Sequence, residues 1–208
     1  MKKISMSTEI RIEKLTESNF SDYESLTRCQ ADGGCYCAFW HQKWTSMADW
    51  EKQQKEAPEK NRAIIFEKVR AHFHVGVLAY KENKLLAWVS VGPLTDFYWT
   101  WKRTIQVGES AKTIAGITCI TLAPEFRGQG LQAELLLALS KYGTTQGWTA
   151  IEGYPFDVNA VKQHKQKVFW PGLTKGFERA GYKRIGPHWL NHPEWERSIY
   201  QFELIKND

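Results

Sequence analysis

The stretch from Thr118 to Tyr142 constrains the fold of this chain more than any other. Residues 118–122 are β-branched or apolar, which suits a buried strand, and Pro124 ends that strand because proline cannot donate to a continuing ladder. After a turn with two glycines at residues 127–130, apolar side chains recur with the 3.6-residue period of a helix. The stretch therefore predicts a buried strand, a tight turn and an amphipathic helix.

The turn in this stretch has the composition of an anion-binding loop. Gly128 and Gly130 let the backbone turn sharply and let a bulky group approach it without a Cβ in the way. Because the turn opens a helix, its free N–H groups point outward at the positive end of the helix dipole, which favours a phosphate. Arg127 adds a fixed positive charge. A plain strand-to-helix turn with glycines for packing also fits, so the turn alone does not decide the function.

At these residues the chain resembles the GNAT superfamily of acyl-CoA-dependent N-acyltransferases. The superfamily's core motif is Arg/Gln-x-x-Gly-x-Gly/Ala, and residues 127–132 match it except that Gln132 replaces the small residue. Residues 177–182, Phe-Glu-Arg-Ala-Gly-Tyr, are similar to the Tyr-Glu-x-x-Gly-Phe run near the superfamily's C-terminus. The resemblance covers roughly residues 75–205, and residues 35–40 resemble a less-characterised bacterial branch.

The resemblance implies an α/β fold with a central mixed sheet, whose parallel strands splay apart, flanked by helices. It also implies that acetyl-CoA lies in the resulting notch as co-substrate. Its pantetheine amides would pair with the central strand at Ile120, Thr121 and Leu122, and an unpaired strand edge is a ready partner for an amide chain. Its pyrophosphate would lie on the backbone amides of Arg127, Gly128, Gln129, Gly130, Leu131 and Gln132.

The remaining strands are expected in the order that the superfamily shows. Residues 75–80 and 85–91 flank a four-residue turn, which predicts a hairpin. Residues 148–153 would run parallel to the central strand through a helical crossover. A first strand and two closing strands are expected at residues 10–13, 182–185 and 198–204.

Three helices are expected before the hairpin. The first ends near Leu26 with Ser18 and Ser21 as candidate caps, and the second covers residues 45–56 with Thr45 or Ser46 as its cap. The third begins at Pro58 and presents one apolar face, made of Ile65, Phe66, Val69 and Phe73. With no repeat and no linker, one domain over residues 1–208 is the simplest account.

Acetyl transfer to an amine needs a base for the amine proton and donors for the oxyanion, and the departing thiolate can need an acid. Phe177 stands where the superfamily commonly has the tyrosine that acts as general acid, and phenylalanine has no proton to donate. Residues 113–122, the central strand, contain no carboxylate that could act as a base. Sites form at strand ends in α/β sheets, where Glu152, Tyr154 and Asp157 lie. We expect Tyr154 as replacement acid and Glu152 as base, although simple packing of Tyr154 and a lysine partner for Glu152 also fit.

The acceptor is open from the sequence. By resemblance, the aromatic-rich connections at residues 29–44 and 94–104 would build its pocket. Because aromatic faces attract cationic amines, a small-molecule primary amine is the first expectation, attacked directly in a ternary complex. A protein or peptide amine is the alternative. Since Phe177 cannot donate, an acyl-CoA-binding or regulatory module without turnover is a third hypothesis.

Composition and cysteine spacing restrict the partners. A net charge of +5 does not by itself favour nucleic acid, and no apolar run approaches a membrane span. No apolar segment of a secretory signal follows Met1, so we expect a cytoplasmic protein without a membrane partner. Cys29, Cys35 and Cys37 do not match the Cys-x₂₋₄-Cys spacing of zinc sites, so reduced thiols without metal are expected, with a thiol or metal sensor as alternative. A homodimer is left open.

Overall fold

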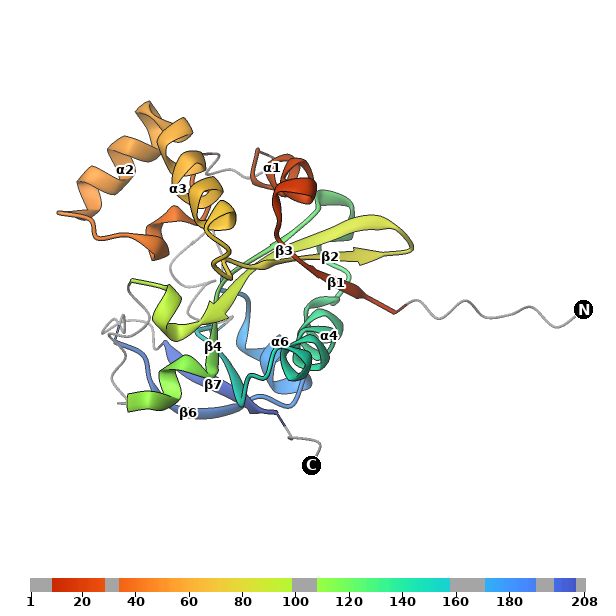
Figure 1. Ribbon diagram of the computed structural model, residues 1–208. Coiled ribbons are helices and arrows are strands. Elements are labelled where there is room, and N and C mark those ends of the chain that lie inside the picture. Colours follow the sequence, from red (N-terminus) through yellow and green to blue (C-terminus); the bar gives the residue numbers. More distant parts are fainter. Residues whose placement is uncertain (1–8, 29–33, 99–107, 158–170, 190–196, 205–208) are drawn as a thin grey trace, which may run out of the picture.

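The computed structural model describes residues 9–28, 34–98, 108–157, 171–189 and 197–204. Within them, seven strands form one mixed sheet in the order β1-β2-β3-β4-β5-β7-β6 (Figure 1). Only the β4–β5 pair is parallel among the paired strands that are described, so the predicted mixed sheet is confirmed. The strands are β1 (Arg11–Lys14), β2 (Val77–Lys81), β3 (Lys84–Pro93), β4 (Ile114–Leu122), β5 (Ala150–Gly153), β6 (Lys183–Pro187) and β7 (Ser198–Glu203).

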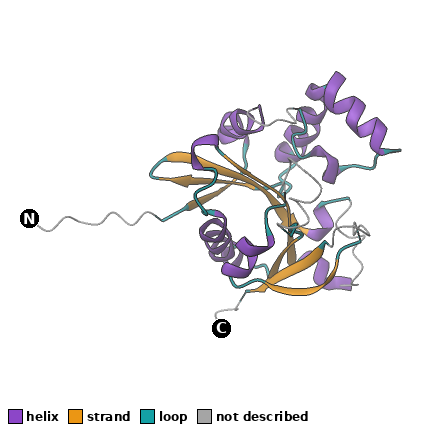
Figure 2. Ribbon diagram, turned by 180° about the vertical axis from the view of Figure 1, so that it is seen from behind, coloured by secondary structure: helices purple, strands orange, loops and turns teal. Residues whose placement is uncertain are grey.

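Helices cover both faces of the sheet (Figures 1 and 2). The α-helices are α1 (Phe20–Arg28), α2 (Met47–Glu56), α3 (Pro58–Arg70), α4 (Gln132–Thr145) and α6 (Thr174–Arg179). Side chains of α4 and α6 form one buried core with the sheet, and side chains of α1 and α3 form a second core on the opposite face. Two apolar faces of one sheet are thus buried by separate helix layers, as the hydrophobic effect requires of a mixed sheet of this size.

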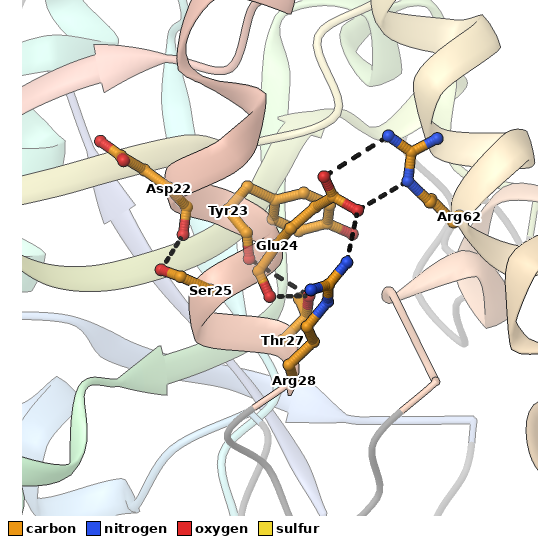
Figure 3. Close-up of polar contacts among 7 residues, drawn as sticks. All are labelled: Asp22, Tyr23, Glu24, Ser25, Thr27, Arg28 and Arg62. Atoms are coloured by element: carbon orange, nitrogen blue, oxygen red, sulfur yellow. Dashed lines mark hydrogen bonds and ion pairs between the residues drawn. The ribbon is translucent and has the colours of Figure 1, made fainter.

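A charge network docks α1 against α3 (Figure 3). The Arg62 guanidinium of α3 donates from Nε to Glu24 Oε1 at 2.6 Å and from Nη2 to Oε2 at 3.4 Å. Arg28 reaches the same carboxylate from one turn further along α1, at 3.6 Å. The bidentate geometry of Arg62 and its position over the Phe20 ring, 5.2 Å from the centroid, fix the two helices relative to each other.

Two details of the helices differ from the sequence-based expectation. A 3₁₀ turn, Glu17–Asn19, runs directly into α1, so the cap position falls at Thr16 and the predicted caps Ser18 and Ser21 are wrong. Phe73 does not extend the apolar face of α3, because the helix ends at Arg70 and the Phe73 side chain is exposed. The predicted cap Ser46 is confirmed, since its hydroxyl accepts the Asp49 N–H at 3.1 Å.

The predicted hairpin between β2 and β3 is confirmed. Its turn residues Glu82 and Asn83 both have positive φ, 51° and 61°, which matches the twist that two-residue hairpin turns require. None of the helices among the described residues combines the length and the apolar composition of a membrane span.

Candidate active site

A notch opens between the two parallel strands. On one side, β4 pairs with β3 as far as Leu122, which lies opposite Ala87. On the other side, its pairing with β5 stops at Ile117, opposite Gly153. Over residues 118–122, the second edge of β4 therefore has no strand partner among the described residues. The splayed parallel strands that the resemblance implied are present.

A β-bulge lies at the point where the strands separate. Ser90 of β3 lies opposite Cys119 and Val91 lies opposite Ile117, so Thr118 is an extra residue in β4. Its hydroxyl donates to the Ser90 hydroxyl at 2.8 Å, and both side chains are buried. Bulges re-aim side chains and end strand pairing, and they are frequent beside active sites. Sequence analysis missed this bulge, because Thr118 fits a regular strand as well as its neighbours do.

The bulge reverses which side chains of β4 face which core. Before it, Ala115 and Ile117 belong to the core under α4. After it, the even-numbered Ile120 and Leu122 pack against that same core, while Cys119 belongs to the core under α1. Because side chains alternate along a strand, this change of parity follows from one extra residue. Ile120 and Leu122 are half-buried and Thr121 is buried, so these three residues can offer a ligand mainly their backbone edge.

The turn after β4 has the geometry that the sequence predicted. Gly128 and Gly130 have φ of 72° and 74°, in the left-handed region that favours glycine. A Cβ built at either residue would meet nothing within 4 Å, so the space beside the turn is open. No backbone hydrogen bond found among the described residues engages the amide nitrogens of residues 128–131. The turn therefore fits a pyrophosphate, with free donors at the start of α4.

The polar side chains of this turn are fixed by the backbone around them. Arg127 donates from Nε to the Leu122 carbonyl at 3.0 Å, and Gln129 donates to the Glu125 carbonyl at 2.6 Å. Arg127 remains exposed, so its remaining guanidinium N–H groups are accessible to an anion. Its bond to Leu122 places this charge at the end of β4.

Gln132, which replaces a small residue of the superfamily motif, turns its side chain away from this loop. Its Nε2 donates to the Leu173 carbonyl at 3.1 Å, and its Oε1 accepts the Leu173 N–H at 3.1 Å. The bulk of Gln132 is thus accommodated against the segment before α6. Leu131 occupies the cap position just before α4 and is half-buried.

The two expected catalytic residues lie on one face of β5 and its continuation. Glu152 precedes the last paired residue of β5, and Tyr154 follows it. Gly153 between them faces the opposite side, where a Cβ would come within 2.3 Å of the Phe177 ring. The Tyr154 hydroxyl donates to Glu152 Oε1 at 2.7 Å, and both side chains are buried. The structure therefore brings the two residues together at the mouth of the notch.

Two residues that sequence analysis missed surround this pair. Arg197 donates from Nε to the Tyr154 carbonyl at 3.2 Å, and its guanidinium lies 4.3 Å from the centroid of Phe156. Burial lowers the pKa of Arg197 to about 10. The His188 ring lies 4.5 Å from the Tyr154 ring. No local motif marks Arg197 or His188, because both reach Tyr154 from the end of the chain through the pairing of β6 and β7.

The predicted acceptor-binding connections also meet in the described part of the chain. The Tyr98 N–H donates to the Trp40 carbonyl at 2.7 Å, and the His41 ring lies 4.9 Å from the Phe97 ring. Burial, followed by the charge of Lys68, lowers the pKa of His41 to about 3, so this imidazole is neutral. The two connections thus pack against each other through buried aromatic side chains and a neutral imidazole.

Three of the cysteines contribute to one core, in which Cys37 and Cys119 are buried and Cys35 is partly buried. Cys37 accepts a hydrogen bond from Trp88 Nε1 at 3.4 Å, and Cys35, Cys37 and Cys119 are free thiols of the core under α1. Cys29 lies outside the described residues. Among those that are described, no group of three or more His, Cys, Asp or Glu side chains could hold a metal ion.

A separate hollow of about 570 Å³ lies away from the notch. It opens over the outer face of α4, between the residues before β1 and the end of β7, and it is lined by Glu9, Leu137, Lys141 and Phe202, among others. None of the expected acetyl-CoA or catalytic residues lines it. The notch between β4 and β5 remains the candidate active site, because the Glu152–Tyr154 pair and the glycine turn after β4 adjoin it.

Comparison with known families decides between the alternatives for this notch. The family model of the acetyltransferase (GNAT) family matches residues 24–165, more than half of the chain. The chain belongs to the GNAT acetyltransferase family. This GNAT protein is accordingly an acyltransferase enzyme with acetyl-CoA as co-substrate, and the glycine turn after β4 fits that molecule's pyrophosphate. A search of curated proteins gave no match.

Solved structures show the same fold at low sequence identity. One is AAC(6')-Ib with paromomycin and acetyl-CoA, with a TM-score of 0.55, 14% identity, and coverage of 94% of this chain and 93% of that chain. Another is a putative phosphinothricin N-acetyltransferase, with a TM-score of 0.52, 16% identity, and coverage of 95% and 100%. A third is a GNAT-family acetyltransferase from Desulfovibrio desulfuricans, with a TM-score of 0.51, 12% identity, and coverage of 94% and 99%.

Proposed function

We propose that this GNAT enzyme transfers the acetyl group of acetyl-CoA directly to the primary amine of a small molecule in a ternary complex. The observation that carries the proposal is that β4 loses its pairing with β5 after Ile117, next to the buried Glu152–Tyr154 pair, and has no other strand partner on that side among the described residues. A strand edge can hold an amide chain in one orientation, and the acid–base pair lies where the strands part.

In this proposal acetyl-CoA extends along β4. Its pantetheine amides pair with the backbone of Ile120, Thr121 and Leu122, because that edge has no strand partner among the described residues. Its pyrophosphate accepts hydrogen bonds from the backbone amides of residues 127–132, and the exposed guanidinium of Arg127 adds charge. These contacts place the thioester close to the bulge at Thr118.

The Glu152–Tyr154 pair would move the proton that the reaction releases. Glu152 accepts a proton as the amine attacks the thioester carbonyl carbon, and the C–S bond breaks as the new C–N bond forms. Tyr154 gives its hydroxyl proton to the departing thiolate and regains one from Glu152 through their 2.7 Å hydrogen bond. An amine that binds protonated first loses one proton to solvent; a second proton then passes from the attacking amine to coenzyme A, and both residues return to their starting state.

The acceptor would bind against the aromatic residues on the face of α1 and α3. Trp40 and Phe97 are buried, so the half-buried Tyr98 is the one of these three aromatic side chains that an acceptor could contact, and aromatic faces attract protonated amines. Structures of AAC(6')-Ib with kanamycin or paromomycin support a small polar amine as the class of acceptor.

The test is release of free coenzyme A from acetyl-CoA over a panel of primary amines and lysine-containing peptides. At least one small amine should accelerate release well above the rate without acceptor, and peptides should not. Acceleration by peptides alone would replace the small amine with a protein acceptor. Calorimetric binding of coenzyme A without turnover on any amine would instead support a binding module.

A further inference from the structure

The Gln132 side chain forms two hydrogen bonds that the small residue of the superfamily motif could not form. Both atoms of its amide group bond to the backbone of one residue, Leu173, at 3.1 Å each. The side-chain amide thus pairs with Leu173 as a residue of a neighbouring β-strand would, through one donated and one accepted hydrogen bond. It holds the first residue of α4, next to the predicted pyrophosphate turn, to the segment that precedes α6.

Two glycines shape the cradle around that amide. A Cβ at Gly172 would lie 2.6 Å from Gln132 Nε2, and a Cβ at Gly176 would lie 2.4 Å from Gln132 Cδ. Both distances are too short for non-bonded atoms, so a side chain at either residue would displace the Gln132 amide from its bonds to Leu173. Gly172 also has φ of 86°, in the left-handed region. The glycines at residues 172 and 176 therefore leave the space that the Gln132 side chain occupies.

The residues on either side of Leu173 are hydrogen-bonded to Phe156, which lies two residues after Tyr154. The Phe156 N–H donates to the Gly172 carbonyl at 3.1 Å, and the Thr174 N–H donates to the Phe156 carbonyl at 3.0 Å. Phe156 also forms a bridge with Arg197, whose Nε donates to the Tyr154 carbonyl at 3.2 Å. A continuous belt thus runs from the start of α4 to Tyr154, across the end of β5.

We propose that Gln132 is a positioning residue that couples occupancy of the pyrophosphate turn to the placement of Tyr154. The inference rests on the proposed function of the notch. When phosphate orders the turn, Gln132 holds Leu173 in place and, through Phe156 and Arg197, keeps the Tyr154 hydroxyl aligned with the thioester. The superfamily's small residue at this position could not make such a link, since it lacks an amide.

Hydrogen exchange with and without coenzyme A tests this coupling. In the wild type, coenzyme A should slow exchange several-fold both at residues 128–134 and in peptides that cover residues 154–157 and 171–176. In Gln132→Ala the first effect should remain and the second should be lost. Gln132→Glu keeps the acceptor for the Leu173 N–H but loses the donor, so protection should be intermediate.

A double-mutant cycle tests the contact itself. Gly176→Ala should weaken coenzyme A binding and lower the melting temperature, because its Cβ meets Gln132. In the Gln132→Ala background the same substitution should be harmless, since the space is free and alanine favours a helix over glycine. Equal effects of Gly176→Ala in the two backgrounds would overturn the proposal.

The kinetic signature separates positioning from mere stability. With an active amine, Gln132→Ala should lower kcat more than it raises KM for acetyl-CoA, and Gln132→Glu should restore part of kcat. Coenzyme A protection that still reaches residues 154–157 in Gln132→Ala would refute the coupling while leaving the proposed function intact. A wild type that shows no protection at the turn would contradict the proposed function instead.

Discussion

The Tyr154 hydroxyl donates a 2.7 Å hydrogen bond to the Glu152 carboxylate, across a glycine that faces the other side of the sheet. Both side chains are buried, with 1% and 0% exposure, so water does not compete for this bond. Replacing either residue therefore removes one hydrogen-bond partner of the other. A substitution of either residue therefore tests the hydrogen-bonded pair as well as the residue that is changed.

We predict that Tyr154→Phe lowers kcat with little change in the affinity for acetyl-CoA. An ordinary phenol has a pKa of about 10, so it is protonated at neutral pH and able to donate. General acids contribute about 10²–10⁴-fold, and an easily departing thiolate favours the low end. Steady-state kinetics with an active amine measure the effect.

The control for that variant is Phe177→Tyr. Phe177 is fully buried against Gly153, so a hydroxyl there would lie on the face opposite Tyr154 and should give little gain. Unchanged turnover in Tyr154→Phe, or a large gain in Phe177→Tyr, would show that the acid lies elsewhere.

Gly130→Asp should abolish coenzyme A binding, because it places a negative charge where pyrophosphate lies. Gly130→Asn is the matched control, since it has nearly the same shape and tolerates positive φ equally well. Both variants should fold, because a Cβ at Gly130 meets nothing within 4 Å. Calorimetry should detect weakened binding in Gly130→Asn and none in Gly130→Asp; equal affinities would contradict a phosphate site.

Arg127→Ala should weaken coenzyme A binding by about 1–3 kcal/mol, the range for a charged hydrogen bond. Arg127→Lys separates two contributions, because it keeps the charge and loses the 3.0 Å bond from Nε to the Leu122 carbonyl. Raising the salt concentration should reduce the effect of Arg127→Ala, since the guanidinium is exposed. A salt-independent loss would point to the Leu122 contact rather than the charge.

Thr118→Val should lower the free energy of unfolding by about 1 kcal/mol, because it leaves the buried Ser90 hydroxyl without its 2.8 Å donor. Adding Ser90→Ala should recover part of that loss, since it removes the hydroxyl left without its donor but also the 3.4 Å bond that this hydroxyl donates to the Val75 carbonyl. Urea unfolding of the two single variants and the double variant measures the coupling. Strictly additive losses would mean that this hydrogen bond does not stabilise the bulge.

Stability should fall as pH drops below about 6.5, the ordinary pKa of histidine. Burial lowers the pKa of His74 to about 4, although its Nδ1 bonds to the Val91 carbonyl at 2.9 Å and its Nε2 to the Tyr142 hydroxyl at 2.9 Å. Between these two pKa values the unfolded chain binds more protons, so acid favours unfolding, and above the higher value the contribution is constant.

Urea unfolding at about pH 7 and about pH 5 measures this dependence, with a slope of up to about 1.4 kcal/mol per pH unit for each such histidine. His74→Gln should flatten the slope, because glutamine offers a donor and an acceptor without titrating. His41 contributes in the same direction, since its pKa is also lowered, to about 3. An unchanged slope in His74→Gln would assign the effect to other groups.

Local patterns predicted most of the fold, and long-range contacts account for what they missed. The turn at Gly128 and Gly130 and the hairpin at Asn83 depend on neighbouring residues, so the sequence indicates them directly. The bulge at Thr118 depends on Ser90, 28 residues away, and nothing in its own strand marks it. The Gln132 departure was visible in the motif, but the direction of its side chain depends on Leu173.

The same distinction applies to the candidate site. Glu152 and Tyr154 could be selected because they end a predicted strand, and the structure adds the hydrogen bond between them. Arg197 could not be found, because its contact with Tyr154 arises only when β7 pairs beside β5.

The open edge of β4 also affects how the protein behaves outside catalysis. Without its co-substrate, the edge of β4 beyond Ile117 has no strand partner in the part of the chain that the structure describes, and half-buried Ile120 and Leu122 lie beside it. Such an edge is a template for adding a strand from another chain. Acetyl-CoA would thus occupy the place of a missing strand and cover this edge of the sheet.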